Sequence, residues 1–138
     1  MVKPICRDTV LLSMPAKPAG EADLQTARDL ADMLLAHRSQ CVGMAANMIG
    51  VPKCIIAILL PGTLLPIVML NPKITAKSGA YQTQEGCLSL PGERPASRWR
   101  SITVRWTDMK MQPHQQSFEG FAAQIIQHET DHLAGILI

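Results

Sequence analysis

The stretch IIQHETDHLAGILI, residues 125–138, carries the pattern that decides how this chain folds and what chemistry it can do. His128, Glu129 and His132 form the arrangement H-E-x-x-H, in which a helix offers two imidazoles to a metal ion and a carboxylate to its bound water. A catalytic zinc-type site takes three protein ligands and keeps one position open. Metalloprotease patterns of this kind usually have their third ligand well downstream, but only six residues follow His132. The third ligand must be sought elsewhere.

A helix is predicted to begin at residue 119 or 120 and to run to Ala134, with Gly135 as its C-terminal stop. One inward stripe of this helix is predicted to carry Phe121, Ile125, His128 and His132. A lone buried histidine is more often a core residue with a hydrogen-bond partner. Two histidines one turn apart, with a glutamate after the first, arise by composition on the order of one time in a hundred or less. The pattern therefore favours a metal site.

Cys87 is the best-placed third ligand. The remaining histidines are His37, at the end of an earlier predicted helix, and His114, in a polar stretch typical of a surface turn. Cys87 lies in EGCLSLPG, where a glycine lets the backbone approach closely and the thiolate is a strong ligand for zinc or iron. A Cys, His, His set leaves the fourth position for water, which the ion acidifies toward neutral pH.

The composition favours one cytosolic domain spanning residues 1–138. Apolar residues make up 47% of the chain, and 13 basic against 11 acidic side chains leave a net charge of +2. This bias is too small to indicate nucleic acid or an acidic membrane as partner. The N-terminus has no uninterrupted apolar run of the kind a secretory signal needs. The four cysteines are therefore expected to be reduced thiols, and Cys6, Cys41 and Cys54 to be small core residues.

The rest of the chain predicts an α+β fold. A surface helix with one buried stripe is predicted from residue 21 to about residue 38, and buried strands at 54–60 and 67–70. Residues 71–100 contain many turn formers and are expected to be rich in loops. Residues 102–106 alternate as a half-exposed strand. Strands followed by one late helix, without alternating β and α units, favour α+β over a parallel sheet.

Three segments together resemble peptide deformylases, the metal enzymes that remove the formyl group from N-formylmethionine at the start of new bacterial polypeptides. The family patterns are G-x-G-L-A-A-x-Q, E-G-C-L-S and Q-H-E-x-D-H. They appear here as CVGMAANM at 41–48, EGCLS at 85–89 and QHETDH at 127–132, with LNP at 70–72 between the first two. The resemblance covers nearly the whole chain. It implies antiparallel sheets packed around a central metal-binding helix.

The resemblance also implies a role for each residue of the centre. Cys87, His128 and His132 become the metal ligands, and Glu129 becomes the general base that passes a proton from water to the leaving amine. The backbone N–H of Leu88 becomes a donor to the developing oxyanion. The family's working metal is typically ferrous iron, and zinc, nickel or cobalt can substitute.

A substrate pocket is implied as well, for N-formylmethionyl peptides or nascent chains. Arg94 and Arg98 match family arginines in the loop after the cysteine, although a loop arginine is more often simply solvated. The residues implied to line the methionine pocket and pair with the peptide are Val42, Gly43, Glu85, Gly86 and Ile125.

The first motif departs from the family at three positions. Met48 replaces a glutamine whose amide donates a second hydrogen bond to the oxyanion, and a thioether cannot donate. Loss of one such donor typically costs about 100- to 1,000-fold in turnover. Asn47 has an amide but is expected to point elsewhere. Cys41 replaces a glycine and Met44 a leucine, and Cys41 would bring a second thiol near the metal, able to be oxidised or to compete as a ligand.

The first hypothesis is therefore a metal-dependent deformylase, with activity weakened by Met48. The alternative is a catalytically impaired, deformylase-like protein that binds metal or formylpeptides without useful turnover. An ordinary metallopeptidase is a weaker reading, because its third ligand would lie downstream of the helix. The sequence leaves the oligomeric state and the native metal open.

Overall fold

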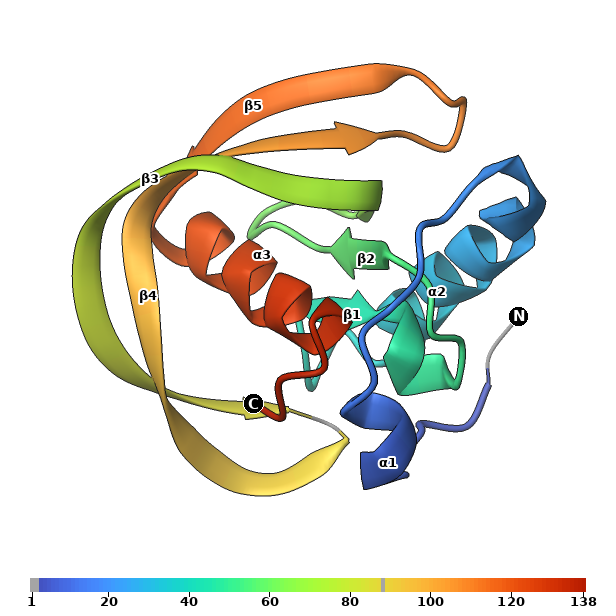
Figure 1. The fold of residues 1–138 in the computed structure, drawn as a ribbon, viewed down its shortest axis with the longest axis horizontal. Coiled ribbons are helices and arrows are strands. Elements are labelled where there is room, and N and C mark those ends of the chain that lie inside the picture. Colours follow the sequence, from blue (N-terminus) through green and yellow to red (C-terminus); the bar gives the residue numbers. More distant parts are fainter. Residues whose placement is uncertain (1–2, 88) are drawn as a thin grey trace.

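The computed structural model describes residues 3–87 and 89–138 and shows a long helix wrapped by a curved sheet (Figure 1). The helices are α1 (Thr9–Leu12), α2 (Leu24–Ala36) and α3 (Gly120–Leu133), with short 3-10 turns η1 (Glu21–Asp23) and η2 (Ala46–Ile49). The strands are β1 (Gly43–Ala45), β2 (Ile55–Ile58), β3 (Ile67–Cys87), β4 (Leu90–Thr107) and β5 (Pro113–Glu119). The described strands pair in the order β1-β2-β3-β4-β5, always antiparallel. The α+β prediction is confirmed.

Most predicted elements are present, but their ends differ: the helices and the strand at 54–60 are shorter, and the strands predicted at 67–70 and 102–106 belong to the longer β3 and β4. The first predicted helix is α2, preceded by the 3-10 turn η1, and the strand predicted at 54–60 is β2. The helix predicted to end at Ala134 is α3, and Gly135 follows it with φ 80°, a left-handed conformation that glycine adopts without strain. The four cysteines are free thiols, each only partly buried. None of the helices in the described residues is long and apolar enough to cross a membrane.

The prediction of a loop-rich segment at 71–100 was wrong. These residues form most of the β3–β4 hairpin, whose register runs from Leu70 opposite Thr107 to Cys87 opposite Leu90. Much of this hairpin is exposed, so polar turn formers occupy its solvent side, and register shifts absorb irregular positions. Pro95 lies where β4 pairs with β3 but not with β5, so it occupies a sheet edge, where proline is tolerated. The turn-forming residues are present in this segment, but they lie on paired strands and not in loops.

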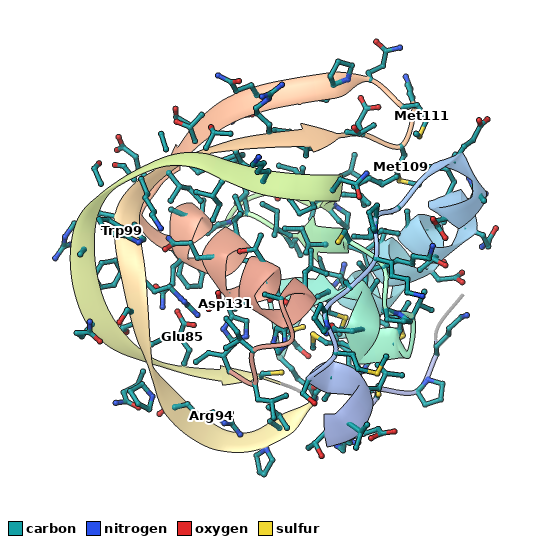
Figure 2. The ribbon with its side chains drawn as sticks, in the orientation of Figure 1. Glu85, Arg94, Trp99, Met109, Met111 and Asp131 are labelled. Carbon is teal, nitrogen blue, oxygen red and sulfur yellow. The ribbon has the colours of Figure 1, made fainter. Side chains whose placement is uncertain are left out.

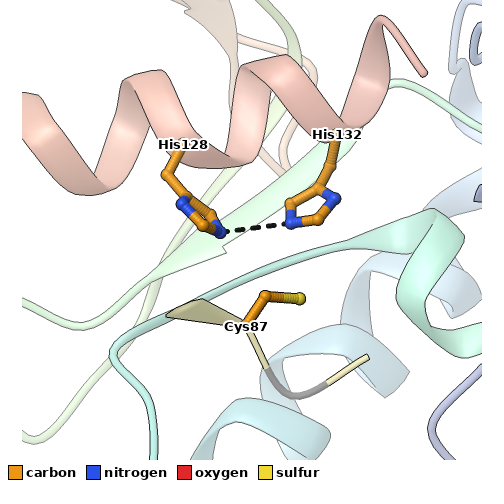
Figure 3. A group of neighbouring side chains, drawn as sticks. All are labelled: Cys87, His128 and His132. Carbon is orange, nitrogen blue, oxygen red and sulfur yellow. Dashed lines mark hydrogen bonds between the residues drawn. The ribbon is translucent and has the colours of Figure 1, made fainter. Parts of the chain in front are cut away.

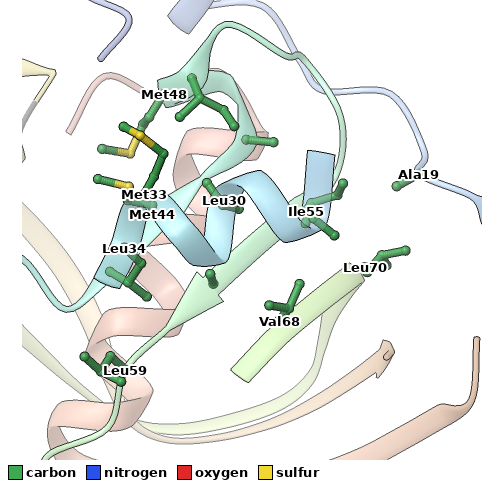
Figure 4. Packing of buried hydrophobic residues seen from close by; sticks show 14 residues of the cluster. Ala19, Leu30, Met33, Leu34, Met44, Met48, Ile55, Leu59, Val68 and Leu70 are labelled. Carbon is green, nitrogen blue, oxygen red and sulfur yellow. The ribbon is translucent and has the colours of Figure 1, made fainter. Parts of the chain in front are cut away.

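The apolar core lies on both faces of the short strands. In β2, Ile55 and Ala57 pack against α2, together with Leu30, Met33 and Met44 (Figure 4). The alternate residues of β2 point to α3, because successive strand residues face opposite sides. That second cluster contains Ile56, Ile58, Met69, Val104 and Ile126. Helix α3 is therefore fixed between β1–β2 and the arch of the β3–β4 hairpin, which brings the end of β3 to its C-terminal half.

Candidate metal centre

Cys87 at the end of β3 meets His128 and His132 of α3 (Figure 3). The three potential ligand atoms lie within 4.8 Å of one another, and the two Nε2 atoms are 3.2 Å apart. Two nitrogens bound to one tetrahedral ion at about 2.0–2.1 Å lie about 3.3 Å apart. The Ser89 N–H donates to Cys87 Sγ at 3.2 Å, which holds this sulfur beside the two imidazoles. The donor set and its spacing therefore fit one divalent cation.

The other two histidines lie elsewhere. The ring of His37 contacts the carbonyl of Met33 in its own helix, and His114 lies on β5, where it stacks on Trp106 and bonds Asp108. Within the described residues, no other cluster of cysteine, histidine or carboxylate side chains forms a possible metal group.

Glu129 is placed beside the ligands as a buried carboxylate. It is 4% exposed, and its Oε1 has no hydrogen-bond partner among the described residues. Burial raises its pKa to about 7, although the charge of His128 acts to lower it. Gly43 leaves it room, because a Cβ there would lie 2.9 Å from Glu129 Oε2 and 2.7 Å from Ile125 Cγ2. A carboxylate with this pKa can accept a proton near neutral pH.

A network of charged groups holds His128. Its Nδ1 donates to Glu85 Oε1 at 2.8 Å, which directs Nε2 to the ligand cluster. The Arg98 guanidinium donates to Glu85 at 2.6 and 2.9 Å and to Asp131 at 2.7 Å, and Gln124 donates to Glu85 at 2.9 Å. Glu85 and Asp131 lie between the hairpin and α3 (Figure 2). Hydrogen bonds from His128, Arg98 and Gln124 overcome the effect of burial and lower the pKa of Glu85 to about 2.

This network corrects one sequence expectation and adds residues that were missed. Arg98 is 4% exposed and not a solvated loop residue. Gln124 and Asp131 were not singled out, yet they lie four residues before and three after His128, on the same side of α3. This spacing from His128 was the sequence feature that could have identified both residues.

The two histidines have opposite electrostatic surroundings. Burial disfavours the charged form of His128, but hydrogen bonds with Cys87 and Glu85 raise its pKa to about 10. Burial and the positive charge of His128 lower the pKa of His132 to about 3. The Nε2 atoms of both histidines must be free of protons to bind a metal, so loading of the site would release the Nε2 proton of His128.

A cavity of about 560 Å³ opens beside these groups. All five residues implied to contact the peptide line it, namely Val42, Gly43, Glu85, Gly86 and Ile125. Phe121 lines it too and is 53% exposed, so its predicted place on the buried stripe was wrong. Arg94 does not line the cavity; its Nη2 donates to the Pro91 carbonyl at 2.8 Å.

The degraded first motif forms the opposite wall of the site. Met48 lines the cavity, and its Sδ accepts from the Ala45 N–H at 3.5 Å. The Asn47 amide donates to the His132 carbonyl at 2.8 Å, so this donor is directed away from the cavity. Cys41 also lines the cavity, and burial together with the charges of Glu129 and Cys87 raises its pKa to about 11. Leu88, expected to supply the oxyanion N–H, lies outside the described residues.

Comparison with known proteins agrees with this architecture. The polypeptide deformylase family model matches residues 2–138. The chain is 44% identical to a peptide deformylase of Clostridium beijerinckii over 138 residues, the full length of both. The fold is similar to a peptide deformylase of Legionella pneumophila, with a TM-score of 0.89 and 33% identity over 99% of this chain and 83% of that one.

A second solved structure, a class I type b peptide deformylase of Acinetobacter baumannii with Met-Ala-Ser bound, aligns with a TM-score of 0.87 and 29% identity. The alignment covers 99% of this chain and 97% of the Acinetobacter chain. These likenesses extend across the helix, the hairpin and the first motif. The chain therefore belongs to the polypeptide deformylase family, whose members are metal-dependent hydrolases that remove a formyl group.

Proposed function

We propose that this protein removes the formyl group of N-formylmethionyl peptides with one divalent cation held by Cys87, His128 and His132. The observation that carries the proposal is the convergence of these three ligands beside the buried, unpartnered Oε1 of Glu129. The bound ion would act as a Lewis acid that activates water and polarises the formyl carbonyl. Ferrous iron is the proposed ion in the cell, and zinc, nickel or cobalt suits the same ligands.

Glu129 is the proposed general base. Its carboxylate takes a proton from the attacking water and returns it to the amine that leaves, and burial, which raises the pKa of this carboxyl, favours both transfers. The backbone N–H of Leu88 is proposed to donate to the oxygen that becomes negative. The position of the second donor is taken by Met48, which has none to offer. A lower turnover than that of a glutamine-containing enzyme is therefore expected.

The cavity is proposed to receive the methionine end of the peptide. Val42, Ile125 and Phe121 supply apolar surface for a thioether side chain, and Gly86 leaves backbone accessible for pairing with an extended peptide. The Met-Ala-Ser complex of the Acinetobacter enzyme supports a peptide of this kind as ligand. The Glu85 carboxylate is engaged with Arg98 and His128, so its contribution is proposed to be through the backbone.

The test is hydrolysis of a formyl-Met tripeptide by protein loaded anaerobically with ferrous iron or nickel, with metal content measured on the same sample. Turnover should be present and should vanish in Glu129→Ala. Fully metallated protein without turnover would contradict the enzyme and favour the alternative, a protein that binds metal or formylpeptides only. Unformylated peptides serve as the control substrate, and their cleavage would indicate a general peptidase.

A further inference from the structure

The two metal-binding histidines differ in what supports the ring nitrogen that faces away from the centre. His128 Nδ1 donates to the Glu85 carboxylate. His132 Nδ1 is buried and has no hydrogen-bond partner within residues 3–87 and 89–138. In Figure 3 this second nitrogen of His132 is turned away from His128 and Cys87. One ligand therefore has an outer partner and the other lacks one.

An imidazole that binds a metal through Nε2 is neutral and carries its proton on Nδ1. Such ligands almost always donate that proton to a carboxylate, a carbonyl or a water, which fixes the ring's tautomer and orientation. The metal-loaded form of this protein thus needs an acceptor at His132 Nδ1. The acceptor must lie within the core, because His132 is fully buried.

Asn47 contacts His132 and has an unused acceptor. It is fully buried, and its Nδ2 donates to the His132 carbonyl at 2.8 Å. Its Oδ1 is buried without a partner in the described part of the chain. Glu129 Oε1 and Ser89 Oγ are also unpartnered, but Glu129 has its own role and Ser89 follows Cys87 on the hairpin side. Asn47 is the residue already hydrogen-bonded to His132.

We propose that Asn47 is a positioning residue for the metal ligand His132. Its Nδ2 holds the His132 carbonyl, and in the metal-loaded protein its Oδ1 accepts the proton of His132 Nδ1. The pair of contacts fixes Nε2 toward the ion, as Glu85 does for His128. This inference rests on the metal site proposed above. It gives Asn47 a role distinct from that of Met48, which is part of the cavity wall.

The test compares metal release from the unmodified protein with release from Asn47→Leu, a variant of similar size without either polar group. Nickel-loaded proteins are mixed with excess chelator, and release should be about 10- to 100-fold faster in the variant. Asn47→Asp keeps an acceptor and should release metal more slowly than Asn47→Leu. Asn71→Leu is the matched control, because Asn71 bonds the Ala19 backbone. That change should lower stability, because it removes these bonds and places leucine at the left-handed φ of 52°, without altering metal release.

Equal release rates for Asn47→Leu and the unmodified protein would overturn the inference, as would equal acceleration by Asn71→Leu. If Asn47→Leu does not fold, the inference is tested instead by the NMR spectrum of the histidine ring nitrogens in the unmodified, zinc-loaded protein. It should show His132 bound through Nε2, with a hydrogen-bonded Nδ1–H protected from solvent exchange. A rapidly exchanging Nδ1–H would refute the role of Asn47. A failure of the unmodified protein to bind one ion would instead refute the metal site itself.

Discussion

The two sides of the metal centre are built in different ways. On the hairpin side, ionic hydrogen bonds join Glu85, Arg98 and Asp131 to His128, and each of these residues has at least one partner. On the side of η2, the wall is formed by methionines and small residues, and Asn47 supplies one hydrogen bond to the backbone of His132. The departures from the family motif all fall on this second side.

This difference between the hairpin side and the η2 side indicates that each side has its own task in the site. The hairpin side fixes where His128 stands, and removal of one charged group there would take a partner from the others. Apart from Asn47, the η2 side shapes the cavity beside the reacting atoms, so substitutions of its cavity-lining residues should change the rate before they change the fold. Residues of the family motif on the η2 side can therefore be replaced in a protein that still folds. Four changes test this division.

The largest effect is expected on the hairpin side, from Arg98→Met. Removal of the guanidinium leaves the carboxylates of Glu85 and Asp131 without their main partner, which should lower the free energy of unfolding by about 3–5 kcal/mol. Chemical denaturation measures this change in the free energy of unfolding. Arg100→Met is the control, because Arg100 is exposed over the Tyr81 ring and should cost about 1 kcal/mol or less. A similar loss of unfolding free energy in both variants would contradict the proposed difference between the hairpin side and the η2 side.

Next in size is Met48→Gln, on the η2 side. An amide at this position restores a donor to the oxyanion and should raise kcat/KM for a formyl-Met peptide about 100- to 1,000-fold, although Met48 is 2% exposed and the change should lower stability somewhat. Steady-state kinetics at measured metal content provides the test. Met44→Gln, which places the same amide in the core against α2, should give no gain and lower stability. An unchanged rate in Met48→Gln would show that this wall supplies no donor position.

A smaller effect is expected from Gly43→Ala. The added methyl group would press on Ile125 and Glu129, so the carboxylate must shift, and kcat should fall about tenfold while metal content stays constant. Gly20→Ala is the matched control, since a Cβ there meets no atom within 4 Å and the backbone is extended. Loss of metal from Gly43→Ala would place this glycine among the groups that fix the ligands.

The smallest effect is expected from Cys41→Ala. Because burial and nearby negative charge hold the pKa of Cys41 at about 11, its thiol stays protonated and is a poor ligand. Metal stoichiometry and the visible spectrum of the cobalt protein should be unchanged, whereas Cys87→Ala should lose the sulfur-to-metal absorption. A shifted spectrum in Cys41→Ala would show that a second thiolate reaches the ion.

The sequence predicted the helix and the placement of its two histidines well because both rest on local spacing. The histidines stand one turn apart on a periodic segment, and Gly135 marks its end. The hairpin was missed because its pairing is not local and its solvent face accepts the residues that usually mark turns. Pairs such as Glu85 with Arg98 depend on that register, so they could be recognised only once the strands were aligned.

The position of Cys87 at the far end of the hairpin from its entry has a consequence for folding. About 40 residues separate it from His128, so a bound ion acts as a cross-link that closes a long loop. A cross-link over such a span reduces the chain entropy of the unfolded state by an amount worth about 4 kcal/mol. A bound ion would thereby link two distant parts of the chain, and removal of the metal should lower the free energy of unfolding by a similar amount.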